Sequence, residues 1–159
     1  MPTPGVTYQI FVERRPDSIT GVMSVVGSDG SKPFDRIPIR SGQRGYTGTN
    51  ALWVRGKSPC PPGVFNVWTD SNNKGQVAGL RGIGEAFPVD TEGDRWTIKG
   101  SGPGQLREEI MIHEENSMAG SAGCIVVVSH AQWRKFLAFM HALNEQRVPR
   151  LKLTVFFKT

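Results

Sequence analysis

Glycine and proline occur throughout the sequence, and this restricts the possible fold more than any other feature. The chain has 19 glycines and 11 prolines among 159 residues, and they follow no regular period. Both residues interrupt helices and favour turns, so a bundle of long helices is excluded. Without a Gly-X-Y repeat, collagen is excluded as well. We therefore expect a single mainly β domain over residues 1–159, with short strands joined by many turns.

Alternating and apolar runs between the turn signals mark the expected strands. They are Tyr8–Arg15, Gly21–Val26, Phe34–Arg40, Val64–Trp68, Arg95–Lys99, Glu109–His113 and Leu151–Phe157. Pro38 has no N–H to donate, which predicts that the third of these runs lies at a sheet edge or a bulge. The polar, glycine-rich segments 41–50 and 71–84 are expected to be loops.

One helix is expected, near the C-terminus. Apolar residues between Trp133 and Leu143 recur at helical spacing and would form one face. Ser129 and Gln132 form a capping-box pattern at the start of this segment, and Pro149 follows its end.

Charge narrows the classes of partner. The formal net charge is +5, which favours a polyanion such as nucleic acid, a membrane surface or an anionic cell-wall polymer. The basic residues are dispersed, and no recognition helix, zinc-finger spacing or RNA-binding aromatic motif is present, so we expect no nucleic-acid partner. No apolar stretch reaches the ~18 residues of a membrane helix, so no membrane insertion is expected. The N-terminal segment has no basic and apolar regions typical of a signal peptide.

A histidine and a cysteine in the segment 112–125 are the strongest candidates for catalytic residues. His113 ends an expected strand, and Cys124 follows eleven residues later, directly after Gly123. A cysteine thiolate is a strong nucleophile, and a histidine within hydrogen-bond reach can remove the thiol proton. A glycine before the nucleophile lets the backbone turn tightly and direct N–H groups at an oxyanion. This pattern favours covalent catalysis by Cys124 with His113 as its base.

The same residues also have a purely structural interpretation. Cys124 begins an apolar run typical of a core strand, and His113 can be a structural residue at a strand end. Cys60 lies between two prolines and is expected to be inert. The sequence has neither a His-Glu-x-x-His nor a Cys-x-x-Cys pattern, so we expect no metal and no cofactor. Two cysteines do not make a disulfide framework in a chain of this length.

Several segments match, in order, the signature of one enzyme family. That signature has a His-Gly near a strand end and then Ser-His/Asn-Gly-Cys-Ile/Val-Arg. The corresponding residues of this chain are Ile112-His113 and Ser121-Ala122-Gly123-Cys124-Ile125. Residues 60–67 (CPPGVFNV) match a Thr-Pro-x-Gly-x-Phe/Tyr-x-Ile/Val element, and Ile37–Gly42 matches a strand ending in serine-glycine. With the helix and last strand over 129–157, the chain from Tyr8 to Phe157 resembles the L,D-transpeptidase catalytic domain (the YkuD-like family).

The resemblance implies a fold and an activity. The implied fold is a β-sandwich of mixed sheets with one capping helix near the C-terminus. The implied activity is that of a peptidoglycan cysteine acyltransferase, in which Cys124 forms a thioester with the stem tetrapeptide and passes it to an amine or to water. Gly123 and Ser121 would belong to the catalytic site beside Cys124 and His113. The implied substrate-binding residues are Asn116, Ala122 and Arg107.

Three departures from the family signature leave other outcomes open. Glu114, Ala122 and Val126 replace a glycine, a His or Asn, and an arginine, and the interval from histidine to cysteine is short. Short versions of the signature resemble those of phage proteins and secretion-system effectors. Together with the replaced arginine, this leaves a phage- or effector-type L,D-carboxypeptidase or endopeptidase open as an alternative. A non-catalytic wall-binding or virion module is the contrasting alternative. The expected site of action is the periplasm or cell wall, reached by phage, by a secretion system or with a removed leader.

Overall fold

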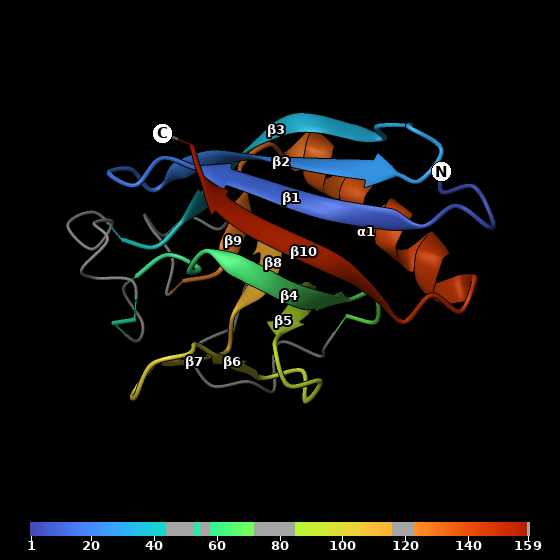
Figure 1. Cartoon of the computed structure of the whole chain (residues 1–159). Coiled ribbons are helices and arrows are strands. Elements are labelled where there is room, and N and C mark those ends of the chain that lie inside the picture. Colours follow the sequence, from blue (N-terminus) through green and yellow to red (C-terminus); the bar gives the residue numbers. More distant parts are fainter. Residues whose placement is uncertain (44–52, 55–57, 72–84, 116–122, 159) are drawn as a thin grey trace.

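A mixed β-sheet closed into a barrel forms the body of the protein (Figure 1). The structure is a computed structural model that describes residues 1–43, 53–54, 58–71, 85–115 and 123–158. The barrel strands are β1 (Tyr8–Arg14), β2 (Thr20–Gly27), β3 (Phe34–Ser41), β4 (Gly63–Trp68), β5 (Ala86–Asp90), β8 (Met111–Glu114), β9 (Ile125–Val127) and β10 (Arg150–Phe157). Their order around the barrel is β1-β10-β4-β5-β8-β9-β3-β2. A separate two-stranded sheet contains β6 (Thr97–Lys99) and β7 (Leu106–Glu108).

Two parallel pairings make the sheet mixed. The last strand, β10, lies parallel to the first strand, β1, and β8 lies parallel to β9, whereas the other pairs are antiparallel. Alternate residues of β1 point into the barrel: Tyr8, Ile10, Val12 and Arg14 are buried. This period of two is the pattern of a strand with one face on a core.

The single helix of the described residues, α1 (His130–Glu145), closes one end of the barrel (Figure 1). Its N-cap is Ser129, whose hydroxyl accepts a hydrogen bond from the Gln132 amide, as the sequence predicts. Phe136 makes edge-on contacts with Phe34 and Phe87, which lie where β3 and β5 begin. The opposite end, where β1 and β3 end and β2 and β9 begin, is called the Ser41 end below.

The mainly β class, with one helix near the C-terminus, is confirmed, but a two-sheet sandwich is not. The strand pairings instead form one closed sheet. Of the two positions expected for Pro38, the sheet edge is wrong, because β3 pairs with both β2 and β9. The β2–β3 register does shift between Met23 and Val25, next to Pro38, as the expected bulge predicts. The sheet accommodates this proline because the β3–β9 pairing covers only Ile39–Ser41. Within the described residues, no helix is long and apolar enough to cross a membrane.

Candidate active site

His113 belongs to β8 and Cys124 directly precedes β9, the neighbouring parallel strand, so that the two residues lie on the same face of the sheet. The β8–β9 register pairs Ile112 with Ile125 and His113 with Val126. Continued by one residue, it places Cys124 beside Met111, two positions before His113. Since alternate residues share a face, Cys124 and His113 are diagonal neighbours, with Cα atoms about 8 Å apart for a standard sheet. An imidazole and a thiol can meet across this distance.

This face is apolar around the two side chains. Ala86, Met111, Cys124 and Val126 form a buried cluster of their own, separate from the main core. Ala86 lies opposite His113 on β5, and Val126 lies opposite it on β9. His113 therefore has a small or apolar neighbour on each side and exposes only 5% of its surface.

One hydrogen bond fixes the tautomer of the neutral His113 ring. Its Nδ1 lies 2.7 Å from the carbonyl oxygen of Glu114. Because a carbonyl oxygen only accepts, Nδ1 carries the proton, and Nε2 keeps the lone pair of the neutral ring. Burial lowers the pKa of His113 below its ordinary value, despite the opposing effect of this hydrogen bond. The imidazole is therefore neutral at pH 7 and able to accept a proton at Nε2.

The Cys124 thiol is protonated at neutral pH. Burial raises its pKa to about 11, although a hydrogen bond with the Met111 backbone and the positive charge of Arg107 act in the opposite direction. The thiol donates a hydrogen bond to the carbonyl oxygen of Glu109 over 3.4 Å. Nucleophilic attack by this sulfur would therefore need a base to remove its proton.

Gly123 is required by the backbone before the nucleophile. Its φ is +106°, and a Cβ there would collide with the Arg107 guanidinium and lie 2.8 Å from Ile110 Cδ1. The Gly123 carbonyl accepts a hydrogen bond from Ser41 Oγ (3.2 Å), which itself accepts one from the Cys60 amide (2.9 Å). The end of β3 and the segment before β4 therefore hold the turn that presents Cys124.

Arg107 lies inside the protein, 1% exposed, against Gly123. It donates hydrogen bonds to the carbonyl oxygens of Ser58 (2.9 Å) and Pro59 (3.0 Å). Its predicted role in substrate binding stays a prediction, and the contacts show that it supports the Gly123 turn. Cys60 is fully buried, and burial raises the pKa of its thiol to about 12, as suits a structural residue.

The remaining predicted site residues, Asn116, Ser121 and Ala122, lie outside the described residues. Sequence reasoning missed two supporting groups: the hydroxyl of Ser41 and the carbonyl of Glu114. Ser41 belongs to the serine-glycine element of the family resemblance, which was the available signal for it. Glu114 acts through its backbone, which no residue type reveals.

Among the described residues, no group of three or more His, Cys, Asp or Glu side chains is arranged to hold a metal ion. No protein-family model and no curated protein matches the sequence.

Proposed function

We propose that this protein is a cysteine acyltransferase that acts on the stem peptides of peptidoglycan, with an L,D-transpeptidase-like fold. The observation that carries the proposal is the placement of a buried thiol, Cys124, directly before β9 and diagonally across from a neutral histidine, His113, on the adjacent parallel strand β8. The hydrogen bond from His113 Nδ1 to the Glu114 carbonyl supports it, because in the neutral ring that burial favours this bond places the proton on Nδ1 and the lone pair on Nε2.

The reaction follows from these two groups. His113 Nε2 takes the proton of Cys124 as Sγ attacks the amide carbonyl at the L-centre of the diamino acid. The backbone amides of Gly123 and Cys124 stabilise the oxyanion that forms. The imidazolium then returns its proton to the departing nitrogen of D-alanine, and a thioester remains. An incoming amine or a water molecule, deprotonated by His113, attacks the thioester and frees the thiol.

Transfer and hydrolysis differ only in this last step. An amine acceptor gives a 3-3 crosslink or an exchanged D-amino acid, whereas water gives L,D-carboxypeptidase or endopeptidase action. Val126, in place of the family arginine, lies opposite His113 and adds an apolar neighbour.

Analysis of muropeptides after incubation with wild type and Cys124→Ala distinguishes the products of transfer from those of hydrolysis. Action on this substrate would place the protein in the periplasm or cell wall.

A non-catalytic wall-binding or virion module is the second candidate. One observation favours it: Cys124 exposes only 2% of its surface, and its thiol has a raised pKa. A buried, protonated thiol also suits a purely structural cysteine.

Covalent labelling by a carbapenem tests the proposal directly. We expect intact-protein mass spectrometry to show one stable adduct on wild type and none on Cys124→Ala. Cys60→Ala is the matched control and should keep the adduct, because its thiol lies outside the proposed mechanism. His113→Gln should slow adduct formation by about a hundredfold or more, the usual contribution of a general base. No adduct on wild type, or an equal adduct on Cys124→Ala, would favour the non-catalytic module.

A further inference from the structure

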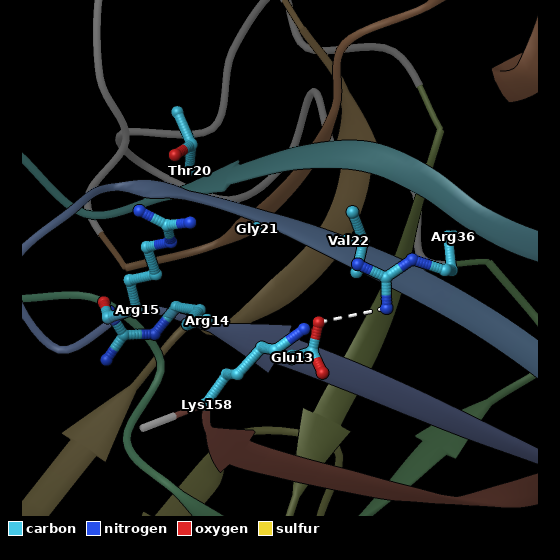
Figure 2. A pocket seen from close by; sticks show the side chains of 8 residues that line it. All are labelled: Glu13, Arg14, Arg15, Thr20, Gly21, Val22, Arg36 and Lys158. Atoms are coloured by element: carbon cyan, nitrogen blue, oxygen red, sulfur yellow. Dashed lines mark hydrogen bonds and ion pairs between the residues drawn. The ribbon is translucent and has the colours of Figure 1, made fainter.

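A cavity of about 300 Å³ lies where β1 ends and β2 begins, and its lining is strongly basic (Figure 2). The charged residues that line it are Glu13, Arg14, Arg15, Arg36 and Lys158. Arg15 directly follows β1, and Lys158 directly follows β10, so the pairing of the two parallel strands places the backbones of these two residues next to each other. The cavity belongs to the Ser41 end of the barrel.

The single carboxylate of this lining is already paired. Glu13 Oε2 lies 3.0 Å from Arg36 Nη1, as the dashed line in Figure 2 shows. No carboxylate among the described residues forms an ion pair with Arg14, Arg15 or Lys158. The cavity therefore has three positive charges in excess.

Arg14 distinguishes this cavity from an ordinary basic surface. It is 1% exposed, and its Nη1 donates to the carbonyl oxygens of Ser18 (3.2 Å) and Arg15 (3.4 Å). Its Nε and Nη2 are buried and have no hydrogen-bond partner. The ring of Phe157 lies 4.7 Å from the guanidinium carbon and offers only a cation–π contact.

A buried guanidinium with unsatisfied donors is unfavourable, and it stays charged because arginine does not lose its proton in proteins. Burial lowers the pKa of Arg14, but from a starting value far above neutrality. Native structures seldom leave such groups uncompensated, and an ion is one recognised explanation. A negative charge inside this cavity would offset the buried positive charge of Arg14 across a short distance.

We infer that this cavity binds a phosphate group. Arg15 and Lys158 would contact the phosphate oxygens directly, and Arg14 would attract the anion through the poorly screened interior of the protein. Three excess cations favour a dianion over a monoanionic carboxylate, and guanidinium groups match phosphate oxygens in geometry. The inference is independent of the chemistry at Cys124, since it uses different residues.

Phosphate binding can be measured on the whole chain at constant ionic strength. In isothermal titration with inorganic phosphate at pH 7.5, we expect saturable binding to wild type and at least tenfold weaker binding to an Arg15→Gln/Lys158→Gln double variant. Lys152→Gln is the matched control, because Lys152 is an exposed lysine of β10 outside the cavity lining. It should bind phosphate as wild type does.

Two further ligands identify the source of the phosphate. Glycerol 3-phosphate, a monoester, should bind at least as well as inorganic phosphate if the natural ligand carries the group on a larger molecule. Weaker binding of the ester would assign the cavity to the free ion. Acetate, a monoanion, should bind at least tenfold more weakly than either.

Arg14 provides the second test. Arg14→Met keeps much of the side-chain volume but removes the buried charge, so phosphate should no longer raise the melting temperature of this variant. If Arg14→Met fails to fold, the double variant carries the test alone. Absence of saturable binding to wild type, or equal binding by wild type and the double variant, would overturn the inference.

Discussion

At the scale of single residues, the geometry before the nucleophile depends on Gly123. Its φ of +106° is one that residues with a side chain rarely adopt, and an added Cβ would collide with the Arg107 guanidinium and lie 2.9 Å from Ser58 O. We predict that Gly123→Ala lowers the free energy of unfolding by about 2–4 kcal/mol, from backbone strain and overpacking together. Urea denaturation measures this change.

Gly104 offers a control for the backbone contribution alone. Its φ is +72°, and an added Cβ would meet nothing within 4 Å. Gly104→Ala should therefore lower the free energy of unfolding by only about 1 kcal/mol. Equal losses in the two variants would show that the contacts around Gly123 contribute nothing.

Arg107 should influence the reactivity of Cys124 by its charge. The positive charge opposes the rise in the pKa of the Cys124 thiol, and it also attracts an anionic reagent. In a Cys60→Ala background, we predict that Arg107→Gln lowers the ratio of the iodoacetate to the iodoacetamide alkylation rate about three- to tenfold. Arg107→Lys should keep most of the wild-type ratio.

The ratio separates charge from loosened packing. A merely looser structure would expose Cys124 equally to both reagents, so each rate would rise and the ratio would stay constant. A ratio that is the same in wild type and Arg107→Gln would therefore contradict an electrostatic role.

The sequence could identify the site residues whose side chain, or lack of one, is itself characteristic of catalysis. Cys124, His113 and Gly123 stand in one short segment, and thiol, imidazole and glycine are recognisable there. The contact from Ser41 to Gly123 joins residues 82 positions apart, and Arg107 reaches Ser58 across 49 positions. Such contacts depend on the closed sheet, so the sequence alone did not predict them.

At the scale of elements, α1 stabilises the barrel through its aromatic side chains. Phe136 is fully buried, and its ring centroid lies 5.6 Å from that of Phe34 and 5.8 Å from that of Phe87. We predict that Phe136→Ala lowers the free energy of unfolding by about 3–5 kcal/mol, because it removes these contacts and leaves a cavity. Chemical denaturation followed by circular dichroism is the measurement.

Lys135 is the matched control, since it precedes Phe136 on the exposed side of the helix. Lys135→Ala should change the free energy of unfolding by less than about 0.5 kcal/mol. A comparable loss in both variants would contradict the packing explanation, because alanine has a higher helix propensity than either lysine or phenylalanine.

The helix and strands differ in how well their sequence patterns predict them. The helix and the long strands β1, β2, β3, β4 and β10 were predicted because their apolar residues follow a helical or an alternating period. β5 was missed because all five of its residues are buried, which leaves no alternation to read. β9 has only three residues and appeared in the sequence as part of one apolar run.

At the scale of the whole molecule, closure of the sheet depends on the pairing of the two chain ends. β1 pairs with β10 along six residue pairs, from Gln9 with Lys152 to Arg14 with Phe157. This contact joins opposite ends of the sequence, so local patterns cannot distinguish a closed barrel from a two-sheet sandwich. The same pairing brings Arg14 and Lys158 to the cavity at the Ser41 end.

The stability of the whole fold should depend on pH through His113. Burial lowers the pKa of this imidazole in the folded protein, whereas in the unfolded chain it returns to about 6.5. Above that pH both states are neutral and His113 has no effect. As the pH falls below 6.5, the unfolded state binds the proton first, so the free energy of unfolding decreases by up to about 1.4 kcal/mol per pH unit, until the pH reaches the folded-state pKa.

His113→Gln isolates this contribution, because glutamine can still donate a hydrogen bond to the Glu114 carbonyl but does not titrate. Urea denaturation of both proteins at pH 7.5, 6.5 and 5.5 should give a steeper decrease for wild type than for the variant below pH 6.5. Carboxylates elsewhere titrate in both proteins and cancel in the difference. Parallel curves would contradict a buried, neutral His113. The proposed acyl transfer also needs an unprotonated Nε2, so a lowered His113 pKa predicts that activity is lost only below pH 6.5. Parallel curves would contradict this second expectation as well.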